Sequence, residues 1–420
     1  MSEKTRNRIT LVVISLCAGI IYQVPYLKAV FYDALQTALG VSHTDLGSLN
    51  SIYGIVAMIL YIPGGIMADK VRMKYLFPIS MIACGLLVFW YSTIPPLRTL
   101  QLIHLLLGIF SILTFWSARV KIVRYLSDKT TFPTNQGISN SVYALAAMLC
   151  SFAALSFISS NTENSIDGLR AALVFYGIAY TAFGVLSFFC IPKFEDEIDT
   201  SKKFHIHEFI SAIKMPGVWV VALSMFVIYA IQISIPYTTP YLTNVFLAPA
   251  VLISAISIAR SYGINFLSAP VSGYIARKIG STAKLMVIYS LCTIVLVSLF
   301  LFIPANPALV IPVIALSLFC AFFSTAMNGL GMVQMDEVGV PKQLYGGASG
   351  VVSVIAYLPD VFIYTLYGVW LDKYTGSIGY NRIFMAVIVF AVLSIGLSMI
   401  VLKKGKHLQG SVKPAVPVDE

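Results

Sequence analysis

The sequence has few charged residues. Asp, Glu, Lys and Arg make up 11% of the 420 residues, where a soluble domain has about 25%. Hydrophobic residues make up 58%, and the mean hydropathy is +0.85. A soluble domain of this length has too little interior to hold so many apolar side chains. The composition therefore excludes a soluble enzyme, a disordered chain and a nucleic-acid-binding domain, and it predicts an integral membrane protein.

Metal-binding and catalytic motifs are also missing. The six cysteines lie within apolar stretches and form no CxxC pair, so neither a disulfide framework nor a zinc cluster is predicted. The sequence has no P-loop and no G-x-S-x-G motif, which argues against an ATP-driven pump and a serine hydrolase. We expect no metal, no cofactor and no enzymatic activity.

Long hydrophobic runs fill most of the chain. A helix needs about 20 mostly apolar residues to cross the hydrocarbon core of a bilayer. Such runs predict an all-α membrane protein with twelve transmembrane helices. The predicted spans are 9–36, 45–68, 74–94, 99–126, 137–159, 170–192, 215–243, 250–275, 283–303, 308–332, 344–370 and 382–402.

The positions of the basic residues predict the orientation. If the N-terminus is cytoplasmic, 22 of the 28 Lys and Arg residues fall in cytoplasmic segments and 4 in outer segments. Cytoplasmic loops of membrane proteins are enriched in Lys and Arg, so both termini are expected in the cytoplasm and the protein in the cell inner membrane. The same bias accounts for the net charge of +10 without a nucleic-acid partner.

The chain contains an internal repeat. The peptide PYLKAVF at 25–31 returns as PYLTNVF at 240–246, and YGI at 53–55 returns at 262–264. These matches occur in the same order at nearly the same offset, which predicts two parallel six-helix repeats. The expected division is a first bundle at 1–192, a cytoplasmic linker at 193–214, a second bundle at 215–402 and a cytoplasmic tail at 403–420.

Two six-helix halves joined by a charged linker resemble the major facilitator superfamily. That superfamily has the signature G-x-x-x-D-[RK]-x-G-[RK]-[RK] between its second and third helices. The stretch GIMADKVRMK at 65–74 keeps Gly65, Asp69, Lys70 and the final lysine, but it has Arg72 where a glycine is usual.

A second copy of the signature, GYIARKIG at 273–280, keeps Gly273 and Lys278 but has an arginine in place of the acid. The resemblance implies alternating access, with the substrate bound between two rocking halves. It also implies a cytoplasmic gate. The expected gating residues are Gly65, Asp69, Lys70, Gly273 and Lys278.

Two basic residues lie inside predicted spans and belong to neither the cytoplasmic nor the outer segments, and a charge at such a position is costly and usually marks a transport pathway. The guanidinium of Arg260 can bind a carboxylate or phosphate through two hydrogen bonds, and Lys28 can bind an anion from the first half. Two alternatives stay open. Lys28 can extend toward the outer interface, and Arg260 can form a structural ion pair with Asp360.

Neutral polar side chains near these charges complete the candidate site. Tyrosine and glutamine offer hydrogen bonds without adding charge. The expected substrate-binding residues are Lys28, Arg260, Tyr22, Gln23, Tyr26, Tyr53, Tyr229, Gln232 and Tyr262. Asp33, Asp360 and Lys121 are candidates for coupling, although Lys121 is equally well explained as a cytoplasmic anchor.

Taken together, these features predict a monomeric secondary transporter that moves a small organic anion, coupled to protons or to a second anion. The stretch from Gly40 to Gly47 resembles the organophosphate and sugar-acid branches of the superfamily. The alternative is a proton-coupled exporter of drugs or other lipophilic compounds, with Asp33 or Asp360 carrying the proton. The predicted partners are a small molecule and the lipid bilayer.

Overall fold

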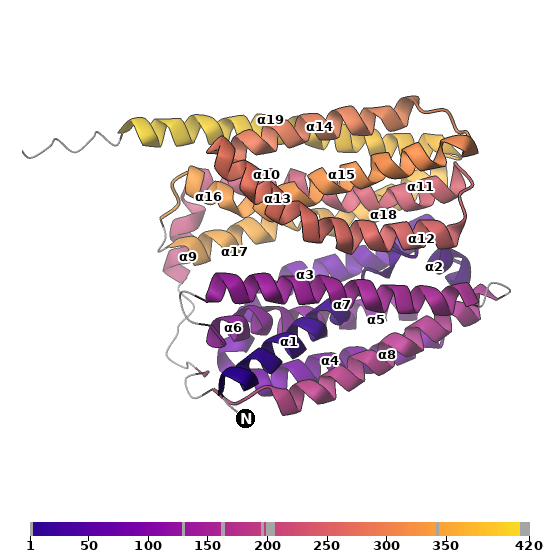
Figure 1. Ribbon diagram of the computed structural model, residues 1–420, viewed down its shortest axis with the longest axis horizontal. Helices are drawn as coiled ribbons and strands as arrows, with labels where there is room; N and C mark the ends of the chain where they lie inside the picture. The colour runs from indigo at the N-terminus through magenta and orange to yellow at the C-terminus, as the bar shows by residue number, and fades with distance from the viewer. Residues whose placement is uncertain are drawn as a thin grey trace, which may run out of the picture.

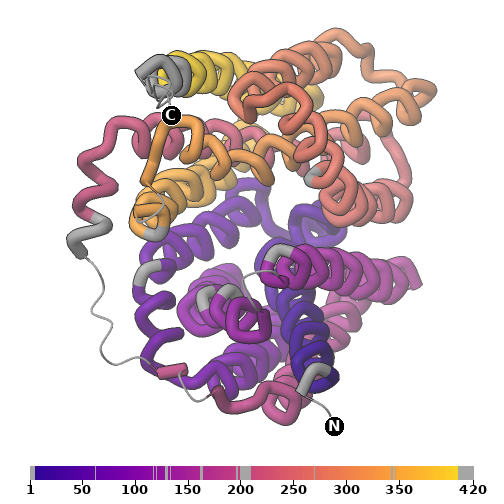
Figure 2. Tube along the Cα trace, turned by 60° about the vertical axis from the view of Figure 1, so that its left-hand side comes forward, coloured from indigo at the N-terminus to yellow at the C-terminus, as the bar shows by residue number. Residues whose placement is uncertain are grey.

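A computed structural model describes residues 3–127, 131–160, 164–194, 197–198, 206–341 and 344–411. The regular elements in these ranges are all helices. Helices up to residue 190 form one half of the molecule and those from residue 216 form the other half (Figure 1). Both ends of the described chain lie on one side of the molecule, here named the terminus side, and α2 and α11 lie on the opposite side (Figures 1 and 2).

The first half contains six helical passages. Two of them are built from more than one helical element. The elements are α1 (Glu3–Ile21), η1 (Leu27–Ala29) and α2 (Tyr32–Leu39); α3 (His43–Lys70); α4 (Met73–Ser92); α5 (Leu97–Gly108), η2 (Ile109–Trp116) and α6 (Ser117–Tyr125); α7 (Phe132–Ser160); and α8 (Ser165–Cys190).

The second half repeats this plan after α9 (Ile206–Ile213). Its elements are α10 (Pro216–Ser234), η3 (Ile235–Tyr237) and α11 (Thr238–Asn244); α12 (Ala250–Ile258), η4 (Ala259–Gly263) and α13 (Ile264–Ile279); α14 (Thr282–Phe302); η5 (Pro307–Leu309), α15 (Val310–Leu330), η6 (Gly331–Val333) and α16 (Gln334–Glu337); α17 (Tyr345–Ala356) and α18 (Pro359–Lys373); and α19 (Ser377–Ser411). The all-α fold with two six-helix repeats is confirmed.

Ten helices of the described chain are long and apolar enough to cross a membrane. An eleventh passage, α3, is bent by 55° between His43–Tyr61 and Pro63–Lys70. A proline at this point removes one backbone hydrogen bond and crowds the preceding turn, which explains the bend. The first predicted span, 9–36, is the remaining passage, and it is broken into α1, η1 and α2.

The break in the first passage lies in the repeated peptide PYLKAVF. Residues 22–26 form a turn and Leu27–Ala29 form a single 3₁₀ turn before α2 begins at Tyr32. Pro25 has no backbone N–H, so the α-helix cannot continue through it without losing a hydrogen bond. The break directs Lys28 toward the interface between the halves.

Two segments differ from their predicted boundaries. The stretch 193–214, expected as a solvated connector, contains α9, which packs against α17, and a buried Glu197 whose carboxylate accepts from the backbone N–H of Met73. The last helix was expected to end at 402 but continues to Ser411. Lysine is a good helix former, and no proline interrupts this segment before Pro414.

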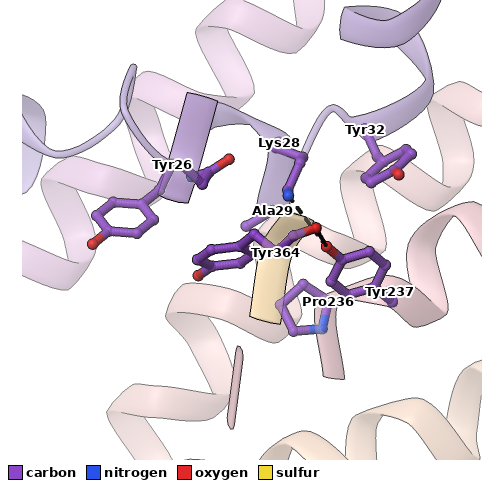
Figure 3. Close-up of a pocket in the computed structure, with 8 residues that line it drawn as sticks. Tyr26, Lys28, Ala29, Tyr32, Pro236, Tyr237 and Tyr364 are labelled. Carbon is purple, nitrogen blue, oxygen red and sulfur yellow. Dashed lines mark hydrogen bonds between the residues drawn. The ribbon is translucent and has the colours of Figure 1, made fainter. Parts of the chain in front are cut away.

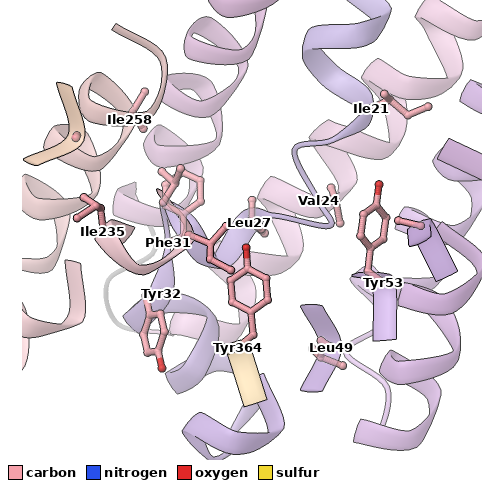
Figure 4. Close-up of a cluster of buried hydrophobic side chains, with 14 of the residues drawn as sticks. Ile21, Val24, Leu27, Phe31, Tyr32, Leu49, Tyr53, Ile235, Ile258 and Tyr364 are labelled. Atoms are coloured by element: carbon pink, nitrogen blue, oxygen red, sulfur yellow. The ribbon is translucent and has the colours of Figure 1, made fainter. Parts of the chain in front are cut away.

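A buried apolar cluster joins the two halves at the centre of the molecule. Leu27 and Phe31 lie beside Ile235 and Ile258 of the second half, as Figure 4 shows. Tyr364 lies in the same cluster and is 7% exposed. The polar site described below is therefore surrounded by apolar side chains.

Close packing of α3 against α18 closes the opposite side. A side-chain carbon at Gly54 would lie 2.6 Å from Cβ of Asp360, and one at Gly368 would lie 2.6 Å from Cα of Thr44. Glycines permit this approach because they have no Cβ. On the terminus side, in contrast, a Cβ at Gly65 or Gly273 would have no atom within 4 Å. Gly54 and Gly368 thus mark tight packing between the halves, whereas Gly65 and Gly273 lie where the helices are not closely packed.

Gly368→Ala should destabilise this conformation. The added methyl group would meet the backbone of His43 and Thr44, and overpacking of this kind costs about 1–3 kcal/mol. We expect a melting temperature several degrees lower in detergent. The matched control is Gly65→Ala, which should be neutral or slightly stabilising because alanine favours helix and the site is open. Equal effects of the two substitutions would contradict the packing argument.

Candidate functional site

A pocket lies between the two halves, beside the break in the first passage. Both halves contribute to its wall, and four of the eight lining residues are tyrosines. Figure 3 shows the arrangement, with Lys28 pointing from the first half toward rings of the second half. The lining residues are Tyr26, Lys28, Ala29, Tyr32, Asn50, Pro236, Tyr237 and Tyr364.

Lys28 is the charged group of this pocket. Its side chain is buried, with the residue 6% exposed, and its ammonium donates a hydrogen bond to the Tyr237 hydroxyl at 3.2 Å. The ammonium also lies 4.3 Å from the centroid of the Tyr364 ring and 5.3 Å from that of Tyr237. Aromatic faces attract a cation but do not neutralise its charge. The structure therefore favours a Lys28 side chain that points into the protein over one that extends to the outer surface of the membrane.

Asp360 supplies the acid near the pocket. One carboxylate oxygen accepts from the Tyr229 hydroxyl at 2.9 Å and from the Tyr26 hydroxyl at 3.5 Å. The other oxygen, Oδ1, is buried and has no hydrogen-bond partner among the described residues. A buried, half-satisfied carboxylate is costly, and a bound proton would reduce that cost.

Arg260 lies in η4, the π-helical segment of the eighth passage. It is 3% exposed, and its guanidinium donates to the hydroxyls of Thr238 and Thr239 at 2.7 and 2.8 Å and to the carbonyl of Ala29 at 3.4 Å. The ion pair with Asp360 considered from the sequence is not formed. Both ion pairs found among the described residues involve other side chains. Short π-helical segments often occur at functional sites.

Four further predicted residues take part in two hydrogen-bonded groups. Gln23 accepts from Tyr262 of the second half at 2.9 Å and from Ser151 at 2.8 Å. Tyr53 bonds with the Ser111 hydroxyl at 2.8 Å, and Tyr22 donates to the Ser111 carbonyl at 3.3 Å. These side chains line the interface beside the pocket rather than the pocket itself.

Gln232 is the predicted binding residue with the least support from hydrogen bonding. Its Oε1 is buried and lacks a partner in the described part of the chain. It lies three residues after Tyr229 on α10, so both side chains are on neighbouring faces of one helix. An unsatisfied buried oxygen is available to a hydrogen-bond donor from a ligand or water.

Sequence reasoning did not select two important tyrosines of the pocket, Tyr32 and Tyr364. A signal for Tyr364 exists, because Tyr357, Asp360, Tyr364 and Tyr367 follow helical spacing and place hydroxyls beside the acid. The signal for Tyr32 is weaker, since α2 starts at that residue only after the break in the passage.

Two aspartates connect the halves on the opposite side. Asp372 accepts from the backbone N–H groups of His43 and Thr44 at 2.9 and 2.8 Å, which lie at the N-terminus of α3. Asp33, a predicted coupling residue, accepts from Thr243 at 2.7 Å and from Asn244 at 3.4 Å. A carboxylate at a helix N-terminus is stabilised by the free N–H groups there. The structure thus places Asp33 at a closed interface and not in the pocket.

Lys121 also lies away from the pocket. Its ammonium forms an ion pair with Asp69 at 2.9 Å and donates to the carbonyls of Ala68 and Glu197 at 2.7 and 2.8 Å. The acid of the superfamily signature is therefore bound within its own half in this conformation. The other predicted gating residues, Lys70, Gly273 and Lys278, are exposed or half-buried on the terminus side.

This arrangement, two helical halves with a polar pocket between them, defines a polytopic membrane protein with a central site. A model of the Major Facilitator Superfamily matches residues 11–363. Among curated proteins of Escherichia coli (strain K12), inner membrane protein YqcE is 26% identical over 386 residues, covering 90% of this chain and 91% of that protein. Inner membrane protein YihN is 25% identical over 405 residues, covering 93% and 94%.

Solved structures share the fold. A bacterial homolog of the human lysosomal transporter Spinster has a TM-score of 0.77 at 11% identity, with 99% of this chain and 100% of that chain covered. The nucleoside transporter NupG has a TM-score of 0.71 at 16% identity, with 97% and 100% covered. The chain belongs to the Major Facilitator Superfamily, and it is a membrane transporter and not an enzyme.

Asp372→Asn should weaken the closure of the opposite side. The substitution removes the negative charge that the helix N-terminus stabilises, so the opposite side should open more often. A cysteine at position 51 can report this opening, because Ser51 is 5% exposed and bonded to Thr365 across the interface. We expect Ser51→Cys to react several-fold faster with a water-soluble maleimide when Asp372→Asn is present.

The control for this prediction is Asp45→Asn. Asp45 lies in the same first turn of α3, but its carboxylate bonds with Ser42 of its own half. The control should leave the labelling rate unchanged. If both substitutions accelerate labelling equally, the effect is one of helix capping and not of contact between the halves.

Proposed function

We propose that the protein is a secondary active transporter that moves a small organic anion across the inner membrane by alternating access. The observation that carries the proposal is a pair of buried cations, Lys28 and Arg260, with no carboxylate bound to either among the described residues. An uncompensated buried charge is costly, and an anionic substrate would offset that cost. Hydroxyl groups and aromatic rings around Lys28 suit a hydroxylated anion such as a sugar acid.

The proposed mechanism uses the two halves as rigid bodies. Residues 1–192 and 215–402 would rock about the central pocket. The linker at 193–214 would join them, and residues 403–420 would form a tail. The transporter would act as a monomer. The excess of Lys and Arg on the terminus side supports cytoplasmic termini. The state described here, tightly packed on the opposite side, would then be closed toward the outside.

Asp360 is the proposed coupling residue. Its unpartnered Oδ1 lies beside the pocket that contains Lys28, and its other oxygen is bound by tyrosines of both halves. A proton on Asp360 would change the charge that Lys28 and the substrate experience. Asp33 and Lys121 have protein partners at the two ends of the molecule, so we propose gating contacts for them and not proton transfer. Asp69 and Lys70 would form the cytoplasmic gate. In the state closed toward the cytoplasm, the two halves would approach each other at Gly65, Gly273 and Lys278.

Transport by proteoliposomes tests the substrate class. We expect uptake of labelled D-glucuronate or glycerol 3-phosphate by the wild type, and about ten- to a hundredfold loss in kcat/KM for Arg260→Gln and for Lys28→Gln. This loss corresponds to one hydrogen bond between charged groups. Arg170→Gln is the matched control, because Arg170 forms an exposed ion pair with Asp167. Full transport by both the Arg260 and the Lys28 variant would refute the anion site, and efflux of lipophilic dyes that depends on Asp360 would support the alternative exporter.

Asp360→Asn tests the coupling. The amide keeps a similar shape but cannot exchange a proton in the physiological range. We expect the variant to lose accumulation driven by a pH gradient while retaining exchange of labelled for unlabelled anion across the membrane. Asp33→Asn should retain the pH-driven accumulation in part. If Asp360→Asn accumulates anion normally, then the substrate is coupled through another group or to a second anion.

A further inference from the structure

Three polar contacts join the halves around residues 26–29 of the first passage. Lys28 of the first half donates to Tyr237 of the second half, and Arg260 of the second half donates to the carbonyl of Ala29 in the first half. Tyr26 donates to Asp360 across the same interface. Lys28 and Arg260 therefore each bind an oxygen atom of the other half in this conformation.

The two cations differ in what they would keep if the halves separated. Arg260 would retain Thr238 and Thr239, which lie in its own half. Lys28 would lose its hydroxyl acceptor and both aromatic rings, because Tyr237 and Tyr364 belong to the second half. A buried ammonium without partners is unfavourable, so water or an anion must then take their place.

We propose, building on the anion-transport function above, that Lys28 exchanges partners during the cycle and that Tyr237 is the residue that promotes substrate release. In the state closed on the opposite side, the Tyr237 hydroxyl competes with the anion for the ammonium. In the state open on the opposite side, the anion binds the ammonium without this competitor.

Two consequences follow from this exchange. The anion binds more weakly when the opposite side is closed, so its release toward the terminus side is favoured. By linkage, an anion that binds one state more tightly shifts the population toward that state. Bound anion should therefore increase opening of the opposite side.

Tyr237→Phe tests the proposal in the full-length protein in nanodiscs. The phenyl ring keeps the aromatic contact with Lys28 but removes the hydroxyl acceptor. Without any ligand, we expect the Ser51→Cys reporter to react about ten- to a hundredfold faster with a water-soluble maleimide, which is the shift expected from losing one hydrogen bond to a charged group. The protein without Ser51→Cys gives the background, which would rise if the variant were misfolded.

The matched control is Tyr367→Phe. Tyr367 is buried, its ring lies 5.2 Å from that of Tyr237, and its hydroxyl bonds with Ser234 inside the second half. This substitution removes a comparable hydroxyl without breaking a contact between the halves. Equal labelling of the Tyr237 and Tyr367 variants, or slower labelling of Tyr237→Phe, would overturn the role of Tyr237.

A second arm adds D-glucuronate or glycerol 3-phosphate. Either anion should accelerate labelling in the protein with Tyr237 and add little in Tyr237→Phe, where the competitor is already absent. If Tyr237→Phe opens the interface but neither anion does, the contact between the halves is confirmed and the proposed substrate class is wrong. If an anion opens the interface but Tyr237→Phe does not, the transport proposal stands and the partner exchange is refuted.

Discussion

A cation buried in an apolar bundle must find oxygen atoms or aromatic faces to bind, and this requirement determines the central architecture of the protein. Arg260 meets it with two threonine hydroxyls and a carbonyl, and Lys28 meets it with one hydroxyl and two rings. These partners lie where α10 gives way to η3 near Tyr237 and where the first passage is broken beside Lys28. Backbone that departs from the α-helix is tolerated at membrane depth only where it is enclosed by protein or lines a cavity.

The close contact of α3 with α18 has the opposite chemistry. It depends on the absence of side chains at Gly54 and Gly368, and on backbone N–H groups offered to Asp372. Such an interface is stable when it is closed, and few side chains could form contacts that stabilise a partly open state. On the terminus side, the signature acid Asp69 is bound by Lys121 of its own half. The asymmetry between the two sides is thus built from different interactions and is not a mere displacement of the helices.

The helical passages could be predicted from the sequence because hydrophobic runs and turns are local features. Most boundaries agree within a few residues, and the repeat of PYLKAVF revealed the two halves before any contact was known. The position of Lys28 and Arg260 within spans was predicted for the same reason. Partners could not be predicted, since they depend on which faces meet. Arg260 was paired with Asp360 as an alternative, yet the structure gives it Thr238 and Thr239.

Glu197 is a second residue whose partner could not be predicted from the sequence. An acidic residue in a polar linker is normally solvated, but the free N–H at the start of α4 provides a buried partner for Glu197. Local composition cannot reveal such a long-range cap. The bend of α3 was also missed, although Pro63 is visible in the sequence, because a proline in a transmembrane helix can be accommodated with or without a large kink.

The repeated heptapeptide has an evolutionary consequence. Its two copies place Lys28 and Thr243 at equivalent positions, and the structure gives these residues unrelated tasks, one beside the pocket and one bound to Asp33. Duplication therefore produced matching backbones with unequal chemistry. A chimera of two first halves would carry the lysine twice but neither Arg260 nor Asp360, and a chimera of two second halves would have no Lys28. Neither half on its own contains the information for the complete site, so the two copies can no longer replace each other.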